Sequence, residues 1–433
     1  MSITTASVQE ILKRNYGNKK VHEFLPEEDV LLMKILKFNR AKIQGEYLVE
    51  SLRLQYPNNA VATAANTVPT WTQGVYANGI VKQALVRGSN QLMFDSIGYE
   101  LVKQSETDAQ AIESAVNVTA TGLLYAANFR ASCSMLHGQL GIGTVESVGS
   151  VSGSGPYTRT AVITEASWIP AVAEQLVGAT VDMWSADYTT QQNGAALLGA
   201  TSAGVVTVTN VDLSTRTLTL SSSGNGTSTG TDGVGTVGAG EHIFFQTYSP
   251  TTECAGLSKL LRAASGDTIY GLSATIYPQL RGNVLNKATV PFSTSLLLDA
   301  GGTLADRNGG GDYWGICSNR QFNRINSEES ALVRHTTAAE EAANGFSTIV
   351  VRSGAVKIFL APTKYQKAGQ VSLVPKSACR IGSSDIGFVA DGEEGNALHI
   401  GGAGAREIRL FSNMAPYVPQ ISQTLMLDVL PVV

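Results

Sequence analysis

The segment from Ser105 to Gly138 constrains the fold of this chain more than any other. Its sequence, SETDAQAIESAVNVTATGLLYAANFRASCSMLHG, begins with Ser105 and Asp108 in a capping-box arrangement and ends at a glycine. Apolar and small residues recur along it three, four or seven positions apart: Ile112, Val116, Leu123, Ala127, Ala131 and Met135. This spacing predicts one helix of roughly eight to nine turns, longer than a typical globular helix, that crosses the molecule as a spine.

An acidic stretch without lysine follows this helix. No lysine occurs between Lys103 and Lys259, and residues 145–250 carry two arginines and eight acids. Short runs of alternating apolar and polar residues, separated by Gly, Ser and Asp, predict a small antiparallel β-domain inserted over residues 161–250, with residues 221–240 as a flexible exposed loop. A glycan-binding module would look similar locally. Aromatic side chains for stacking on sugars are scarce here, however: Trp168, Trp184, Tyr188 and two adjacent phenylalanines.

The N-terminal region predicts an arm over residues 1–44. Val8, Ile11 and Leu12 make a small apolar stripe at helical spacing, which needs a partner surface on this chain or on a neighbour. The segment LPEEDVLLMKILKFNRAK, residues 25–42, places its acids in a first turn and its bases near the end, as the helix dipole favours. We therefore expect a second short helix there.

Residues 45–104 predict a long hairpin. Asn78 and Gly79 stand between two β-rich arms and indicate a tight turn, with Tyr76 and Lys82 on either side. The segment has little apolar material with which to bury itself, so we expect it to lie on another surface. The candidate assembly residues are Val8, Ile11, Leu12, Tyr76, Asn78, Gly79 and Lys82. Lys82 is a crosslinking candidate by position, although an ordinary surface lysine is the simpler interpretation.

The segment IYGLSATIYPQLRGNV, residues 269–284, predicts a bend and not a reactive site. It contains no acid and no histidine, Gly271 and Gly282 free the backbone, and Pro278 restricts it. We interpret Pro278, Arg281 and Gly282 as structural residues that turn the chain out of the β-insertion.

Composition and charge favour a protein that covers its surface with copies of itself. The 433 residues are 43% hydrophobic and only 15% charged, with a formal net charge of -4, so the whole chain does not attract nucleic acid. The first twenty residues lack the apolar core of a signal peptide, and no run is long enough to span a membrane. We expect a soluble product made in the cytoplasm, with four single cysteines as reduced, buried thiols.

The sequence gives no strong support for an enzyme. HExxH motifs and P-loops of the GxxxxGK[ST] type do not occur, and the five histidines stand apart from one another. We therefore predict no catalytic, metal or cofactor-binding residues and no cofactor. A glycosidase could hide two carboxylates without a motif, so an enzyme is unsupported by the sequence but still open.

In its element order the chain resembles the major capsid proteins of tailed phages, which share the Hong Kong-type fold with encapsulin shells. The resemblance covers nearly the whole chain, and the segments that carry it are GLSATIYPQLRGNV, WGICSNRQFNRI and KIFLAPTKYQKAGQVSLV. It implies an α+β fold in six parts: an N-terminal arm (1–44), an E-loop region (45–104), a spine helix and the start of a peripheral domain (105–160), the inserted β-domain (161–250), an axial domain (251–400) and C-terminal return strands (401–433).

The resemblance also implies a function. The chain would assemble through pentamers and hexamers into an icosahedral phage head around double-stranded DNA, in the host cytoplasm, with separate scaffolding, portal and decoration proteins and only weak contact with DNA on the inner face. Basic residues such as Lys13, Arg14, Lys19 and Lys20 are candidates for such contact, or are simply a solvated helix end. An encapsulin-like compartment and a glycan-binding adhesin are the alternatives.

Overall fold

The computed structural model describes most of the chain in a series of segments. They are residues 31–44, 47–56, 79–98, 115–153, 156–192, 205–222, 237–307, 309–327, 333–335, 349–388, 397–399 and 405–431. Strands dominate and the helices are few, which confirms the predicted α+β class.

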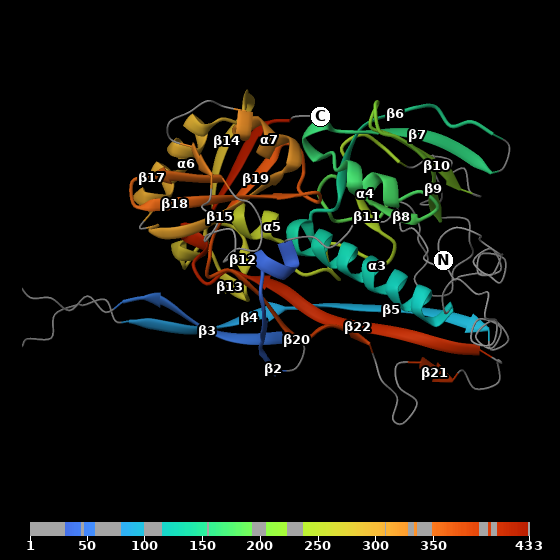
Figure 1. Cartoon of the computed structure of the whole chain (residues 1–433), viewed down its shortest axis with the longest axis horizontal. Helices are drawn as coiled ribbons and strands as arrows, with labels where there is room; N and C mark the ends of the chain where they lie inside the picture. Colours follow the sequence, from blue (N-terminus) through green and yellow to red (C-terminus); the bar gives the residue numbers. More distant parts are fainter. Residues whose placement is uncertain are drawn as a thin grey trace, which may run out of the picture.

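The lower layer in Figure 1 is a five-stranded sheet built around the long strand β22 (Ala405–Tyr417). One side of β22 pairs with β20 (Cys379–Phe388) and β21 (Ala397–His399), and the other side pairs with β5 (Ser89–Gly98). Strand β1 (Phe38–Arg40) adds to β20 in parallel. The sheet is thus assembled from segments at both ends of the sequence.

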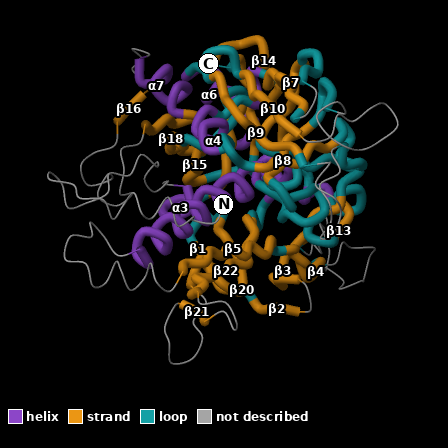
Figure 2. Tube along the Cα trace, turned by 90° about the vertical axis from the view of Figure 1, so that its right-hand side faces the viewer, coloured by secondary structure: helices purple, strands orange, loops and turns teal. Residues whose placement is uncertain are grey.

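Helix α3 (Ala115–His137) lies over β5 and β22 and runs through the middle of the molecule (Figures 1 and 2). Its last seven residues, 131–137, are all buried, and just before them Phe129 meets Phe245 and Tyr365 edge-on at 5.5 and 5.6 Å between ring centroids. The predicted C-terminal end at Gly138 is confirmed. The predicted start at Ser105 lies outside the described residues.

A three-stranded hairpin sheet continues the lower layer on the left of Figure 1. Its strands are β2 (Lys42–Gln44), β3 (Tyr47–Gln55) and β4 (Ile80–Arg87). Alternate side chains are buried on one face: Leu48, Leu52 and Leu54 from β3, and Ala84 and Val86 from β4. The base of the hairpin is fastened to the body where the Leu85 N–H donates to the carbonyl of Tyr270 at 2.9 Å.

Six strands close into a barrel in the upper right of Figure 1. They are β6 (Gly143–Val148), β7 (Tyr157–Ile163), β8 (Thr180–Trp184), β9 (Val206–Asp212), β10 (Thr217–Ser222) and β11 (His242–Phe245). The 3-10 turn η2 (Glu165–Ser167) and helix α4 (Pro170–Gln175) lie against it, and the side chains of Trp168, Ile169 and Val172 are buried there. Strand β6 and the first residues of β7 belong to the barrel, although they precede residue 161, the predicted start of the β-domain. We therefore place the start of the barrel at Gly143.

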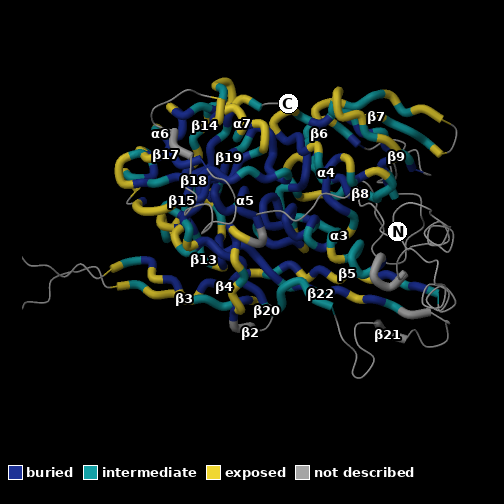
Figure 3. The backbone as a smooth tube through the Cα atoms, in the orientation of Figure 1, coloured by how far each residue is buried: buried dark blue, intermediate teal, exposed yellow. Residues whose placement is uncertain are grey.

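A seven-stranded mixed sheet forms the upper left of Figure 1. Its order is β14 (Asn283–Pro291), β23 (Leu425–Leu430), β19 (Gln370–Pro375), β15 (Gly311–Ser318), β18 (Val356–Thr363), β17 (Ile349–Ser353) and β16 (Val333–His335). Helices α6 (Thr294–Asp306) and α7 (Asn319–Ser327) pack on it. Figure 3 shows the buried residues concentrated inside this sheet, the barrel and α3. The two sheets do not follow the predicted domain boundaries. Strand β23, which was predicted among the C-terminal return strands, joins this sheet, and β20, which was predicted in the axial domain, joins the lower sheet.

Short elements connect the barrel to the seven-stranded sheet. They are α5 (Leu257–Leu261), β12 (Thr268–Ile269), β13 (Leu272–Ser273) and the 3-10 turn η5 (Pro278–Leu280), with η7 (Ile421–Gln423) packed against η5. The remaining element, η1 (Leu31–Ile35), is a short π-helix at the start of the described chain.

The short helix predicted within residues 25–42 is found only as η1, which ends at Ile35, and residues 25–30 lie outside the described residues. After η1 the chain is extended, as β1 and β2. The backbone finds its partners on β20 instead: Arg380 N–H donates to the Lys37 carbonyl, and Ala41 N–H to the Gly382 carbonyl, both at 2.9 Å. Pairing with a distant strand therefore overrides the local charge pattern.

The predicted tight turn at Asn78 and Gly79 lies partly outside the described residues, because Asn78 and the segment before it are not described. The strand that follows it, β4, pairs with β3, whose last paired residue is Gln55. The connection between the two strands therefore runs over residues 56–79, far longer than a two-residue turn. A long hairpin is present, but residues 57–78 lie outside the described residues.

Two adjacent glycines in α6 provide a matched test of packing. A Cβ at Gly301 would lie 2.4 Å from the Cβ of Ser353, whereas a Cβ at Gly302 would meet nothing within 4 Å. Gly301→Ala is expected to lower the free energy of unfolding by about 1–3 kcal/mol through overpacking. Gly302→Ala should raise it by about 0.5–1 kcal/mol, because alanine favours a helix interior. Urea unfolding of both variants measures the difference, and shifts of the same sign would contradict the packing described.

Candidate assembly surfaces

The outer part of the hairpin exposes apolar side chains. Tyr56 is 73% exposed and Val81 is 59% exposed, although both are large apolar groups. Arg53, which pairs with Val81 across the strands, places its guanidinium 5.4 Å from the centre of the Tyr56 ring. These three residues are called the hairpin face.

The lower sheet exposes a second apolar surface. Leu92 is 61% exposed and Phe94 is 64% exposed. Leu92 pairs with Phe411 across the strands, and Phe94 pairs with Arg409, so all four side chains point to one face of the sheet. We call these four residues the sheet face.

The opposite side of the same strands is covered. Gln91 and Asp95 of β5, and Ile408, Leu410 and Ser412 of β22, are buried where α3 packs on the sheet. The alternation along β5 therefore separates a side that belongs to the core of this chain from a side on which Leu92 and Phe94 are exposed.

Sequence reasoning missed the sheet face. The segment SNQLMFDSIG carries the signal, because Leu92 and Phe94 alternate with polar residues as in a half-buried strand. Which set of alternate residues is buried depends on the position of α3, and sequence spacing does not contain that information.

Most of the assembly residues predicted from the sequence cannot be placed. Val8, Ile11, Leu12, Tyr76 and Asn78 lie outside the described residues. Gly79 is exposed immediately before β4, and Lys82 is exposed on β4, on the same side as Leu52.

The bend residues make close contacts within the chain. Pro278 begins the turn η5, and Arg281 donates from Nε to the Ala274 carbonyl at 2.8 Å and from a terminal nitrogen to the Thr275 carbonyl at 3.2 Å. A Cβ on Gly282 would lie 1.9 Å from the carbonyl oxygen of Leu261. Only glycine allows the backbone to approach this closely.

A buried polar cluster joins the end of α3 to the barrel and the seven-stranded sheet. Ser134 Oγ donates to Glu253 Oε1 at 2.8 Å, and the backbone N–H of Gln139 donates to Glu253 Oε2 at 3.3 Å. Burial raises the pKa of Glu253 to about 7 despite these two hydrogen bonds. Lys367, also buried, donates from Nζ to the Gly141 carbonyl at 2.8 Å, and burial lowers its pKa to about 7.

His137 occupies the same junction in a defined neutral form. Its Nε2 lies 2.9 Å from the Tyr365 carbonyl, which can only accept, so we assign the proton to Nε2. Nδ1 then accepts from the Ser258 hydroxyl at 3.2 Å. Burial, and secondarily the nearby Lys367 ammonium, lower the pKa of His137 well below its usual value. The histidine is a structural group that ties three segments together.

The described residues contain no candidate metal centre. Among them, no group of three or more His, Cys, Asp or Glu side chains could hold a metal ion. All four cysteines are buried and none forms a disulfide, and burial raises the pKa of the Cys254 and Cys317 thiols. In the described part of the chain, no helix has both the length and the apolar character needed to cross a membrane.

Comparison with known proteins gives similarity in structure only. No protein-family model matches the chain, and no curated protein matches it in sequence. Among solved structures, it is similar to the capsid of cyanophage A-1(L), with 8% identity, a TM-score of 0.49, and 96% of this chain and 97% of that chain covered. It is also similar to the capsid of a native GTA particle, with 6% identity, a TM-score of 0.46 and 99% of each chain covered.

A third similar structure is the holo-SrpI encapsulin complex from Synechococcus elongatus, with 7% identity, a TM-score of 0.39, and 99% of this chain and 96% of that chain covered. Two of these three structures are thus capsids, and the third is an encapsulin complex. Because these identities and TM-scores are low, the function below is argued from the geometry of this chain.

Proposed function

We propose that this chain is a major capsid protein that assembles into the icosahedral head of a tailed phage and encloses double-stranded DNA. The observation that carries the proposal is the pair of exposed apolar surfaces, the hairpin face and the sheet face, on one elongated layer (Figure 1). Exposed groups of large apolar side chains mark interaction sites.

The hairpin face and the sheet face are made of different residues, so a contact between them joins two unlike surfaces of neighbouring copies. A hairpin face that meets a neighbour's sheet face makes a head-to-tail contact, and such contacts close into rings when the rotation between copies allows it. Each apolar side chain that becomes fully buried contributes about 1.5–3 kcal/mol, so a subunit held on both sides gains several such terms. Pentamers and hexamers are the rings that an icosahedral shell needs.

The other parts of the proposal follow from charge and from the sequence resemblance. With a net charge of -4, the chain is suited to an inner wall that holds packaged DNA only weakly. Scaffolding, portal and decoration proteins would be separate chains, and assembly would take place in the host cytoplasm. The protein would act as a structural component of the virion, without catalysis.

Electron microscopy of the purified protein, expressed alone and with its neighbouring genes, tests the proposal together with light scattering for particle mass. Closed icosahedral particles are expected, and DNA inside particles made with the neighbouring genes would support a phage head. Particles filled with protein cargo would point to a compartment of the encapsulin kind. A monomer or small oligomer in both preparations would overturn the shell function.

Deleting residues 1–20 is expected to leave a soluble, folded subunit that assembles poorly. The deleted segment contains the stripe of Val8, Ile11 and Leu12, which gains apolar burial only on a partner surface. Circular dichroism checks the fold, and the yield of particles on a sucrose gradient measures assembly. Normal particles from the deletion would show that the arm is dispensable.

A further inference from the structure

Strand β5 leaves one of its two edges unpaired. Its inner edge pairs with β22 along its whole length, and no described strand pairs with its outer edge, which lies on the side of α3 in Figure 1. A sheet edge of ten residues presents a row of backbone donors and acceptors and is a template for a further strand.

The direction of the backbone hydrogen bonds along β22 is set by its other neighbour, β20. Arg380 of β20 donates its N–H to the Lys37 carbonyl, on the side of β1. The next residue, Ile381, therefore bonds in the opposite direction, to Ala415 of β22. Because successive residues of a strand bond to opposite sides, the odd-numbered residues of β22 face β20 and the even-numbered residues face β5.

This order identifies the backbone groups of β5 that point outward. The even-numbered residues of β22 pair with the odd-numbered residues of β5. Leu92 and Phe94 therefore direct their backbone N–H and C=O groups away from β22, and no hydrogen bond from the described part of the chain reaches these groups. Ser96, the next residue of this set, donates its N–H to the Asp95 carboxylate at 2.8 Å, as expected for an outward group.

A groove lies beside this edge, between β5 and α3. Its volume is about 600 Å³, which equals about twenty waters at roughly 30 Å³ each. Residues 92–96 of β5 form one wall. The residues of the other wall belong to α3 and are Thr119, Gly122, Leu123, Ala126 and Arg130. We call this space the edge groove, and it is large enough for a short extended segment of backbone.

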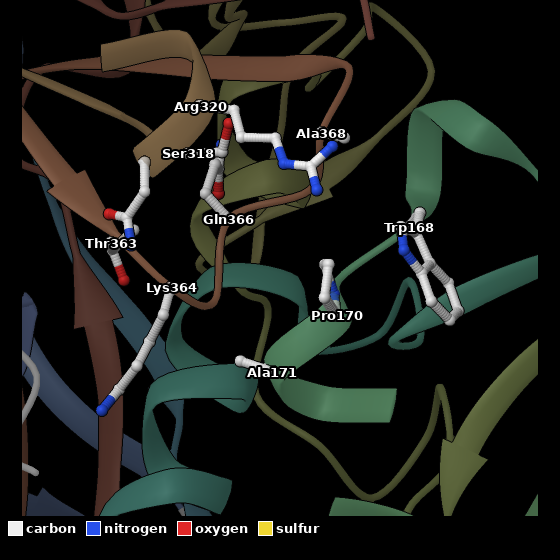
Figure 4. A pocket seen from close by; sticks show the side chains of 10 residues that line it. Trp168, Pro170, Ala171, Ser318, Arg320, Thr363, Lys364, Gln366 and Ala368 are labelled. Atoms are coloured by element: carbon white, nitrogen blue, oxygen red, sulfur yellow. The ribbon is translucent and has the colours of Figure 1, made fainter. Parts of the chain in front are cut away.

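The pocket between α4 and the start of α7 is smaller (Figure 4). Its volume is about 230 Å³, and the charged ends of Arg320 and Lys364 point apart in it. It therefore offers no single place for a charged group, and the edge groove is the stronger candidate for a docking site.

The N-terminal segment of the same chain begins its described part close to the edge groove. Leu31, the first described residue, is buried, and η1 packs on α3. The residues before it lie outside the described residues. The six residue steps from position 25 to Leu31 span at most about 20 Å. Helix α3 is about 34 Å long at 1.5 Å per residue, so this length reaches past half of the helix.

Residues 20–25, with the sequence KVHEFL, are suited to an edge strand. A valine and a phenylalanine favour extended backbone, and Pro26 stands directly after the segment, at a position where a strand can end. The walls of the edge groove carry one acid and one base, Asp95 and Arg130, and the segment likewise carries one glutamate and one lysine. Groove and segment are therefore matched without an excess of like charge.

We propose that residues 20–25 of the same subunit add to the free edge of β5 as a further strand of the lower sheet, in the edge groove. The added backbone pairs with the outward N–H and C=O groups of Leu92 and Phe94. It also covers an edge that could otherwise join copies of the chain in an uncontrolled way. The inference concerns a single subunit and does not depend on shell formation.

Hydrogen exchange of unassembled subunits, followed by mass spectrometry that resolves single amides, tests the proposal. The amides of Leu92 and Phe94 should exchange slowly in the wild type, because both are hydrogen-bonded to the added strand. The amides of Gln91 and Met93, which bond to β22, provide the internal reference for a paired strand.

Proline variants within the proposed strand provide the comparison. Alternate residues of a strand bond to one side, so one of His22→Pro and Glu23→Pro removes an N–H that bonds to β5. That variant should speed exchange at Leu92 and Phe94 about tenfold, the effect of losing about one hydrogen bond. Thr4→Pro, in the same arm but outside the segment, is the control and should leave exchange unchanged.

Three results would overturn the proposal. They are fast exchange at Leu92 and Phe94 in the wild type, slow exchange that neither proline variant within the segment changes, and protection that appears only in assembled particles. The last result would assign the edge of β5 to a segment of another copy. A failure to form shells would not affect the test, because it is made on the single subunit.

Discussion

Replacing Leu92 and Phe94 together by aspartate is expected to abolish particle formation and to leave a folded subunit. Both side chains are more than half exposed in the single subunit, so the charges cost little there. At a contact between copies, the same change removes roughly 3–6 kcal/mol of apolar burial per subunit and places carboxylates in a desolvated interface. Electron microscopy and light scattering measure assembly, and thermal unfolding measures the fold.

The barrel provides the control for this double variant. Val177, in the turn that joins α4 to β8, is 48% exposed and belongs to neither assembly surface. Val177→Asp adds one exposed charge to a similar apolar position and should permit normal particles. If the double variant assembles as well as Val177→Asp, the sheet face is not an interface and the proposed head-to-tail contact is wrong.

Lys367→Met is expected to change how stability depends on pH more than any other single substitution in the junction. The pKa of Lys367 falls from 10.5 in the unfolded chain to about 7 in the folded one, chiefly through burial. Between these values the unfolded state binds more protons, so stability rises with pH. The stability that the folded chain gains when Lys367 is neutral is fully present above pH 10.5, declines as the pH falls and is absent below pH 7.

Relative to Lys367→Met, the wild type should therefore gain on the order of 5 kcal/mol of unfolding free energy between pH 7 and pH 10.5, since each pKa unit corresponds to about 1.4 kcal/mol. The variant also leaves the Gly141 carbonyl without its donor, but this loss is the same at both pH values and cancels in the comparison. Urea unfolding of unassembled subunits at several pH values gives the difference. The exposed Lys82→Met serves as control, and equal pH profiles for the two variants would refute the buried position of the Lys367 ammonium.

Local patterns predicted the features that depend on local interactions. The apolar repeat predicted the body of α3, and the terminal glycine predicted its end. In the structure Gly138 also leaves room for the backbone of Cys254, whose carbonyl oxygen would lie 2.4 Å from a Cβ at this position. Alternation of polar and apolar residues predicted a β-rich segment after the helix, and those strands close into the barrel. In each case neighbouring residues supply most of the information.

The buried polar cluster at the end of α3 is not predicted by local patterns. Ser134 and His137 lie on α3, whereas Glu253 and Lys367 come from two later segments that are more than a hundred residues from α3 and from each other. Nothing in the sequence places these four residues together. Their burial, and with it the shifted pKa values of Glu253 and Lys367, follows only from the packing of α3 between the barrel and the two sheets.

The α+β class, the body of the spine helix and the β-rich character of the segment that follows it could be predicted from spacing along the chain, because helix and strand periodicity are local properties. That residues 38–40 and 42–44 are strands, and that β4 pairs with β3, follows from contacts in the folded chain. The same contacts turn Leu92 and Phe94 away from α3. Strand pairing and burial depend on partners that are distant in the sequence, and a periodic pattern cannot say which of its two faces a partner will cover.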